Sequence, residues 1–162
     1  MGLHLGKSDE IAAYCDADFA SCLDTRRSHT GWVFILYGGA VCWQSKCQST
    51  VAASTVEAEY QSASAAAREA LWLRHLFADL DIPHTPMIIN CDSQGALAAL
   101  NNAQISQRTK HIDVIHYFVR ERCHLGQLKF QFVEGKKNPA DMLTKAVEKP
   151  KHLWCCEQLG LW

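Results

Sequence analysis

The sequence predicts an α/β fold built on a five-stranded mixed sheet, in which a three-strand antiparallel meander is joined by two parallel strands and flanked by helices. Three observations predict it: alternating apolar segments open the chain, a long segment rich in Ala and Leu follows, and two units of strand and helix come next. With 162 residues, of which 48% are hydrophobic, the chain has the size of one compact domain. We expect a single domain over residues 1–162, with its core at about 10–148 and a short tail at 149–162.

The first three predicted strands form the antiparallel meander. Residues 11–19 and 31–37 are apolar segments of strand length, and the second is apolar enough to lie in the centre of the sheet. Gly38 and Gly39 then turn the chain, and residues 40–48 alternate between apolar and polar side chains. Because short turns join antiparallel neighbours, these segments predict three hairpin-linked strands.

A long helix follows at roughly 55–80. This segment contains no Gly or Pro and is rich in the strong helix formers Ala and Leu. It begins with Ser54, followed three residues later by Glu57. A Ser and a Glu at this spacing form the capping box that starts many helices.

Two units of strand and helix complete the predicted sheet. Pro83 and Pro86 end the region of the long helix, and the pair Asn138-Pro139 opens the last predicted helix as N-cap and first helical residue. The segments between them are predicted as strand, helix, helix and strand, at 86–92, 93–102, 106–124 and 127–133. Right-handed crossovers make the two added strands parallel.

Composition excludes several classes of protein. A net charge of -1 gives no overall sign of nucleic-acid binding, so any basic surface must be local. No apolar run approaches the roughly 18 residues that span a bilayer, and the first residues lack the apolar region of a secretory signal. The eight cysteines contain no CxxC pair and mostly fall inside apolar patterns, which predicts buried free thiols and no Cys/His zinc site. We therefore expect an intracellular protein that does not cross a membrane.

Glu57 and Glu59 compete for one position facing the sheet. At 3.6 residues per turn they lie about 200° apart around the helix axis, so only one can face inward. Steps of three and four residues from Glu59 reach only apolar side chains, namely Ala63, Ala66, Ala70, Leu73 and Phe77. The same steps from Glu57 reach Gln61, Ser64, Arg68, Trp72 and His75. Glu59 is therefore predicted on the buried face, where a carboxylate needs a partner, a proton or a metal unless solvent still reaches it in the first turn.

Aspartates stand where predicted strands end or a helix begins. Asp16 and Asp18 interrupt the first strand and face the same side of the sheet, so either is a candidate ligand. Asp92 lies at the carboxyl end of a strand, where open α/β folds bind ligands, although an ordinary N-cap is the alternative. Asp141 lies in the first turn after Asn138, where an acid needs no functional reason.

As a set, these acids are more informative than each is alone. Carboxylates at the carboxyl ends of neighbouring strands can converge on one point, where they repel one another unless cations compensate. Oxygen ligands suit Mg²⁺ or Mn²⁺ rather than zinc. The set Asp16, Glu59, Asp92 and Asp141 therefore indicates a site for two divalent cations that cleaves phosphodiesters.

Six collinear motifs carry a family resemblance from about residue 10 to 160. They are YCDADFA, RRSHTGW, STVEAEY, CDSQGAL, RTKHID and NPADMLTK. In order and spacing they resemble the ribonuclease H domain of copia-type (LTR) retrotransposon Pol polyproteins. The resemblance implies a ribonuclease H-like fold and endonucleolytic cleavage of the RNA strand of RNA/DNA hybrids during reverse transcription, with two Mg²⁺ ions that Mn²⁺ can replace. We also expect the reverse transcriptase domain of the same polyprotein as a partner, a monomer in isolation, and a location in the cytoplasm, a virus-like particle or the nucleus.

The resemblance assigns roles to the four acids. Asp16 would bridge the two ions, and Asp141 would complete the ion that activates water. Glu59 and Asp92 would hold the ion beside the leaving group. Asp18 remains the alternative to Asp16.

Histidine and basic residues complete the expected site. Cellular members of the family carry a histidine in the loop before the last aspartate, whereas the loop VEGKKNPAD has none, and His111 stays open as a catalytic or an ordinary helix-surface residue. Trp32 and Trp43 are expected in the core rather than as platforms for stacked bases. Phosphate contacts, with ordinary surface charge as the alternative for each, are expected from Arg26, Arg27, Lys46, Arg108, Lys110, His111, Lys136 and Lys137.

A catalytically inactive, domesticated or relic domain, which only binds hybrids or has a structural role, is the alternative function. The presence of all four acids favours the enzyme. An integrase or transposase is disfavoured, because such proteins use a late glutamate, whereas Glu59 lies between Asp16 and Asp92.

Overall fold

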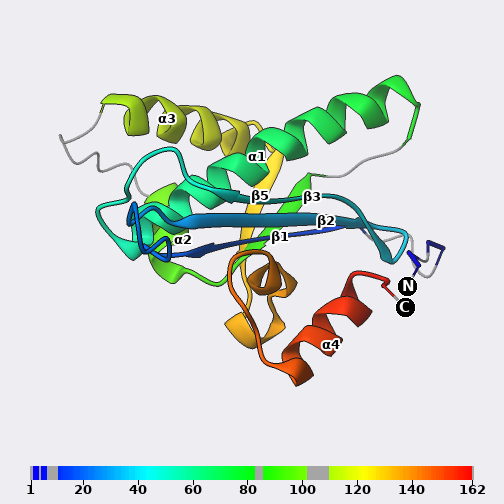
Figure 1. Ribbon diagram of the computed structural model, residues 1–162. Coiled ribbons are helices and arrows are strands. Elements are labelled where there is room, and N and C mark those ends of the chain that lie inside the picture. Colours follow the sequence, from blue (N-terminus) through cyan, green and yellow to red (C-terminus); the bar gives the residue numbers. More distant parts are fainter. Residues whose placement is uncertain (1, 4, 7–10, 83–85, 102–109, 162) are drawn as a thin grey trace.

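The computed structural model describes residues 2–3, 5–6, 11–82, 86–101 and 110–161, and for residues 101 and 110–116 it describes the backbone alone. The elements, in chain order, are β1 (Ile11–Asp18), β2 (His29–Leu36), β3 (Gly39–Cys47), α1 (Thr55–Asp79), β4 (Met87–Cys91), α2 (Gln94–Asn101), α3 (Lys110–His124), β5 (Leu128–Phe132), the 3-10 helices η1 (Gly135–Lys137) and η2 (Pro139–Leu143), and α4 (Lys149–Gln158) (Figure 1).

One five-stranded sheet has the strand order β3-β2-β1-β4-β5. The pairs β1–β2 and β2–β3 are antiparallel, and the pairs β1–β4 and β4–β5 are parallel. The predicted fold class, a three-strand meander extended by two parallel strands, is confirmed. Its consequence for the site is that β1 and β4 are parallel neighbours, so their carboxyl ends lie at the same edge of the sheet.

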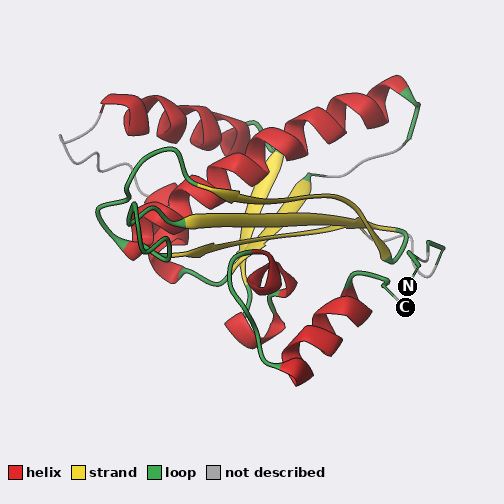
Figure 2. Cartoon of the chain, viewed as in Figure 1, coloured by secondary structure: helices red, strands yellow, loops and turns green. Residues whose placement is uncertain are grey.

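Helices cover both faces of the sheet (Figure 2). On one face, α1 packs with Trp32 and Phe34 of β2 in the main hydrophobic core, which also includes residues of α2 and α3. On the other face, Val33 and Ile35 pack with Leu159, which follows α4. Because successive side chains of β2 point to opposite faces of the sheet, this strand contributes residues to two hydrophobic cores. Among the described residues, no helix is both long and apolar enough to cross a membrane.

Helix α1 begins as the capping pattern predicts, with one difference in detail. The Ser54 hydroxyl accepts a hydrogen bond from the backbone N–H of Glu57 at 3.1 Å. The Glu57 carboxylate accepts from the N–H of Ala53 at 2.8 Å, one residue earlier than the capping box predicts. The predicted inward stripe is confirmed, because its members are all buried: Ala63, Ala66, Ala70, Leu73 and Phe77.

The segment after Asn138 is a 3-10 helix, so the prediction of a further helix there is right in position and wrong in type. The Asn138 side chain accepts from the N–H of Ala140, and Pro139 occupies the first helical position, as its local preferences predict. This 3-10 helix, η2, packs closely against strand β2 of the sheet. A Cβ atom at Gly31 on β2 would lie 2.6 Å from Cγ2 of Thr144 and 2.9 Å from Cβ of Leu143, so glycine is required for η2 to approach β2.

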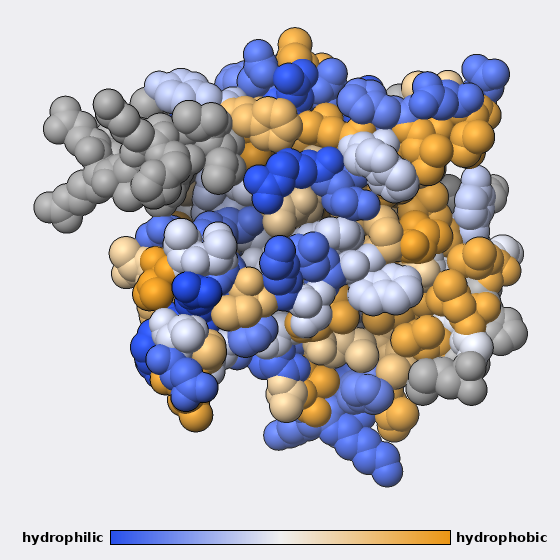
Figure 3. Space-filling model, turned by 45° about the horizontal axis from the view of Figure 1, so that its top comes forward, coloured by the Kyte–Doolittle hydropathy of each residue, from blue (hydrophilic) through white to orange (hydrophobic). Residues whose placement is uncertain are grey.

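Two further expectations have mixed outcomes. Trp32 is buried as expected, whereas the expectation of a core position for Trp43 is wrong, since this side chain on the edge strand β3 is 60% exposed. The helix expected from residue 106 is present from Lys110, and residues 102–109 lie outside the described residues. The side of the molecule that bears α1 and α3 shows hydrophilic residues interspersed with hydrophobic ones (Figure 3).

Candidate active site

Four elements place the predicted acids around the carboxyl ends of β1 and β4. Asp16 lies near the end of β1, Asp92 directly follows β4, Asp141 lies in η2, and Glu59 lies early in α1. Carboxylate oxygens of Asp16, Asp92 and Asp141 all lie within 4.8 Å of one another. Glu59 joins this cluster through Asp92, because a Glu59 oxygen, an Asp92 oxygen and the Cys91 sulfur also lie within 4.8 Å of one another. The structure thus brings the predicted set together from segments more than a hundred residues apart.

Burial dominates the electrostatics of these acids. Asp16 is only 2% exposed, and burial raises the pKa of its carboxyl to about 6, against the hydrogen bond from Thr144 and the charge of Lys145, which lower it. Burial, followed by the negative charge of Asp16, raises the pKa of Glu59 to about 9. Burial and the charge of Asp141 raise the pKa of Asp92. Without cations, the site therefore retains protons that carboxylates in water would lose.

Two lysines supply positive charge to the cluster. Lys145 Nζ lies 2.8 Å from Oδ1 of Asp141 and 3.7 Å from Oδ2 of Asp16. Lys151 Nζ lies 3.4 Å from Oδ2 of Asp141 and also donates to the carbonyls of Gly135 and Lys136. Lys151 therefore connects α4 to both the η1 loop and the acids.

Neutral side chains hold the same segment against the sheet. The Thr144 hydroxyl donates to the Asp16 carboxylate, and Asn138 Nδ2 donates to the carbonyl of Cys15 at 2.9 Å. A Cβ atom at Gly135 would lie 2.9 Å from Oδ2 of Asp92, so this glycine gives the loop room beside the acid.

Sequence reasoning missed Thr144, Lys145 and Lys151. For the first two a signal existed, because they lie three and four residues after Asp141, the spacing that brings side chains together on a helix. For Lys151 we find no sequence signal.

Two oxygens in this cluster are buried and lack a hydrogen-bond partner among the described residues. They are Oε2 of Glu59 and Oδ1 of Asp92. A buried carboxylate oxygen without a partner is unfavourable unless the group keeps its proton or binds a cation. These atoms are therefore free to act as ligands.

Asp18 does not share the position of Asp16. It ends β1 on the same face but is absent from the groups of metal-ligating atoms found among the described residues. His111 lies in α3, with its side chain outside the described residues.

The predicted basic residues lie in several places. Arg26 and Arg27 are exposed in the loop between β1 and β2, and Lys136 and Lys137 in η1 each lie 3.5 Å from a carboxylate oxygen of Glu134. Lys46 is exposed on β3. Arg108 lies outside the described residues, as does the side chain of Lys110.

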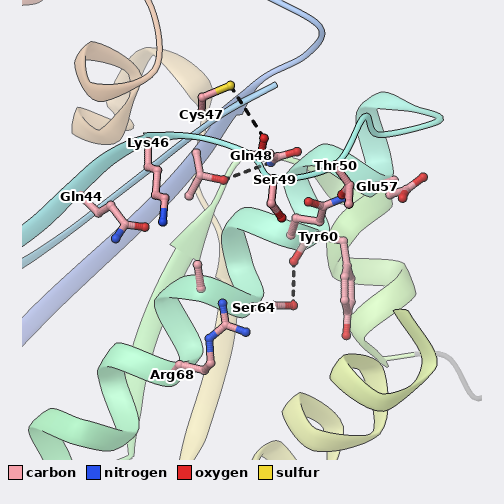
Figure 4. A pocket seen from close by; sticks show the side chains of 13 residues that line it. Gln44, Lys46, Cys47, Gln48, Ser49, Thr50, Glu57, Tyr60, Ser64 and Arg68 are labelled. Carbon is pink, nitrogen blue, oxygen red and sulfur yellow. Dashed lines mark hydrogen bonds between the residues drawn. The ribbon is translucent and has the colours of Figure 1, made fainter. Parts of the chain in front are cut away.

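A cavity of about 390 Å³ lies between β3 and α1, away from the acids. Lys46 extends from β3 and Arg68 from α1 toward the space between them (Figure 4). Gln48, at the end of this groove, donates to Thr30 and to the carbonyl of Ala58. None of the four acids lines this cavity, so we do not assign the chemistry to it.

Comparisons with known proteins identify the family. No protein-family model matches the chain. The chain is 42% identical over 160 residues to the retrovirus-related Pol polyprotein from transposon TNT 1-94 of Nicotiana tabacum, covering 98% of this chain and 12% of that protein. It is 34% identical over 151 residues to the retrovirus-related Pol polyprotein from transposon RE1 of Arabidopsis thaliana, covering 91% of this chain and 10% of that protein. The chain thus spans about a tenth of the length of these relatives.

Solved structures agree on the fold. LC11-RNase H1, isolated from compost, superposes with a TM-score of 0.62 at 15% identity, covering 85% of this chain and 94% of that chain. The structure of LC11-RNase H1 in complex with an RNA/DNA hybrid superposes with a TM-score of 0.59 at 15% identity, covering 83% and 94% of the two chains. The chain therefore belongs to the family of copia-type retrotransposon Pol polyproteins and corresponds to a segment of them that has the ribonuclease H fold.

Proposed function

We propose that this chain is a ribonuclease H that cleaves the RNA strand of RNA/DNA hybrids during reverse transcription of a copia-type retrotransposon. The observation that carries the proposal is the convergence of the Asp16, Asp92 and Asp141 carboxylates within 4.8 Å of one another, on a ribonuclease H fold. Two comparisons support it: the relatives are Pol polyproteins, and a protein of the same fold has been solved with an RNA/DNA hybrid.

The residues at the site fit divalent cations. Asp16, Asp92 and Asp141 offer only oxygen, which suits Mg²⁺ and Mn²⁺. The unpaired, buried oxygens of Glu59 and Asp92 give the cations ligands that no other described group occupies. We propose that the four acids would hold two Mg²⁺ ions, or Mn²⁺ in their place.

When bound, such cations supply Lewis-acid stabilisation of the scissile phosphate and favour ionisation of the attacking water. The chain's own residues prepare the acids for this. The Thr144 hydroxyl orients the Asp16 carboxylate, and Lys151 fixes Asp141 relative to the η1 loop through its bonds to Gly135 and Lys136. Because these supports join β1, η2 and α4, the acids keep their relative positions before cations arrive.

We propose that the hybrid is held by phosphate contacts from the basic residues expected from the sequence. The side chains of Arg26, Arg27 and Lys46 are exposed. Lys136 and Lys137 are exposed beside Glu134 and would exchange that carboxylate for a phosphate, and Arg108, Lys110 and His111 remain candidates. Such contacts read backbone shape and 2'-hydroxyls, so we expect little sequence preference. We also propose the reverse transcriptase segment of the same polyprotein as a partner that adds further contacts to the hybrid. The proposed location of this activity is inside the cell.

The proposal is tested by cleavage of a labelled RNA/DNA hybrid in Mg²⁺ and then in Mn²⁺. Single-stranded RNA, duplex DNA and the Asp92→Asn variant serve as controls. Cutting of the hybrid alone, dependent on the cation and lost in the variant, would establish ribonuclease H activity. Binding of the hybrid without cutting in either cation would instead support the inactive, hybrid-binding module.

A further inference from the structure

Two buried cysteines directly precede Asp16 and Asp92 in the sequence. Cys15 on β1 and Cys91 on β4 are opposite one another in the parallel pairing, and both are 0% exposed. Because paired residues of adjacent strands face the same side of a sheet, both side chains point toward α1, which carries Glu59. Neither cysteine forms a disulfide. Nothing in the proposed cleavage uses them.

The Cys91 sulfur belongs to a donor set that differs from the three aspartates. Its Sγ atom, a carboxylate oxygen of Glu59 and one of Asp92 lie within 4.8 Å of one another. The unpaired Oε2 of Glu59 and Oδ1 of Asp92 are the buried oxygens already noted. One side of the acid cluster therefore combines a sulfur with two oxygens that have lone pairs to offer.

We propose that Cys91, Glu59 and Asp92 form a binding site for a thiophilic divalent cation, Zn²⁺ or Cd²⁺, adjoining the site of the three aspartates. On binding, the Cys91 S–H bond breaks, its proton goes to solvent, and a sulfur–metal bond forms. Three protein ligands leave the fourth tetrahedral position to water.

The geometry requires only a small adjustment. Bond lengths to zinc of about 2.3 Å for sulfur and about 2.1 Å for oxygen place tetrahedral ligands roughly 3.6 Å apart. The three donor atoms are already within 4.8 Å, so side-chain rotations that move them by about 1 Å suffice. Cys15, opposite Cys91 in the strand pairing, is the neighbouring residue on the same face of the sheet.

This site has a consequence for the enzyme, which rests on the proposed function. Glu59 and Asp92 are also the proposed ligands of one Mg²⁺ ion, so a thiophilic cation competes for them. Mg²⁺ prefers oxygen and gains little from Cys91, whereas Zn²⁺ and Cd²⁺ gain a thiolate. Zn²⁺ therefore inhibits Mg²⁺-dependent cleavage through a residue that the cleavage itself does not need.

Cadmium binding tests the site without any reference to activity. Cd²⁺ is titrated into the metal-free full chain, and the ultraviolet charge-transfer absorption of sulfur–cadmium bonds is followed. Wild type is compared with Cys91→Thr, which removes the thiol and introduces a β-branched residue suited to a strand. Cys123→Ala, which removes a thiol from α3, is the matched control for the other cysteines. Should Cys91→Thr fail to fold, Cys91→Ser and Glu59→Gln replace it.

We expect the strongest Cd²⁺ absorption to be lost in Cys91→Thr, with binding weakened about 10- to 100-fold, and to be unchanged in Cys123→Ala. Equal absorption and affinity in wild type and Cys91→Thr would overturn the site, even if the wild type cleaves hybrid. Loss of the absorption in a chain that never cleaves hybrid would support the site and count against the proposed function alone.

Discussion

Lys145 Nζ lies 2.8 Å from Oδ1 of Asp141, four residues earlier in the chain. The same ammonium lies 3.7 Å from Oδ2 of Asp16, so one lysine faces two of the three clustered aspartates. Its side chain is 43% exposed, whereas that of Asp16 is 3% exposed. The cation can therefore withdraw into solvent while the carboxylate stays in place.

Replacing Lys145 by Met should strengthen binding of Mg²⁺ and Mn²⁺ by about tenfold, because a positive charge that competes for the same oxygens is removed. Isothermal titration calorimetry on the metal-free variant measures this affinity. Lys149→Met removes an exposed lysine of α4 that forms no ion pair among the described residues, and it should leave the affinity unchanged. Weaker binding in Lys145→Met would show that Lys145 supports the cations instead of opposing them.

Asp16→Asn and Asp92→Asn should abolish cleavage while leaving the metal-free protein folded. Each variant removes a charge from a buried set of like charges, so its melting temperature without cations should equal or exceed that of the wild type. Hybrid cleavage and thermal unfolding, measured on the same samples, separate the two effects. Unchanged turnover in both variants would exclude these aspartates from catalysis.

Stability without cations should fall as pH rises. Burial raises the folded-state pKa of Asp16 from 3.8 to about 6 and that of Glu59 from 4.5 to about 9, so folding favours the protonated carboxyls. This contribution is complete below about pH 4 and is lost as pH rises through each folded-state value. For Asp16 it amounts to roughly 3 kcal/mol. Urea unfolding measures the free energy of unfolding of wild type and Asp16→Asn between about pH 4 and the folded-state pKa of Asp16. The two values should approach each other toward acid pH. A difference that does not change with pH would contradict the raised pKa of Asp16.

Glu57→Gln and Glu59→Gln should have different effects, the first on stability and the second on cleavage. Glu57 caps α1 by accepting from Ala53, so its variant should lose about 1 kcal/mol of stability or less and retain cleavage. Glu59 offers a buried, unpaired oxygen to the site, so its variant should lose cleavage without loss of stability. Denaturation and cleavage assays on both variants make the comparison, and equal loss of cleavage would refute the choice of Glu59.

Gly31→Ala should weaken the acid site indirectly, by displacing η2. The added methyl group would lie 2.6 Å from Cγ2 of Thr144, so η2 must move away from β2 and take Asp141 with it. We expect a stability loss of about 1–3 kcal/mol and weaker Mg²⁺ binding. Gly2→Ala, where an added Cβ meets nothing within 4 Å, is the control. Wild-type stability and Mg²⁺ affinity in Gly31→Ala would show that η2 tolerates the shift.

Local patterns predicted most of the fold, because strands and α1 depend on periodicity and capping that are written in neighbouring residues. The type of the helix after Asn138 and the exposure of Trp43 were not predictable in this way. The first depends on how closely η2 packs on Gly31, and the second on the position of β3 at the edge of the sheet, where Trp43 stays 60% exposed. Both are properties of the assembled sheet.

For the site, the sequence by itself was enough to select the four candidate acids, to show the family resemblance and to favour Glu59 over Glu57, since helical periodicity assigns each glutamate to a face. Only the tertiary structure decided that Asp16 and not Asp18 shares a cluster with Asp92 and Asp141, because the end of a strand is fixed by the segments that pack on it. It likewise decided the contacts of Lys145 and Lys151 and the place of Cys91 beside Glu59. These contacts join residues far apart in the chain, and their distances are fixed by the packing of sheet, α1, η2 and α4 together.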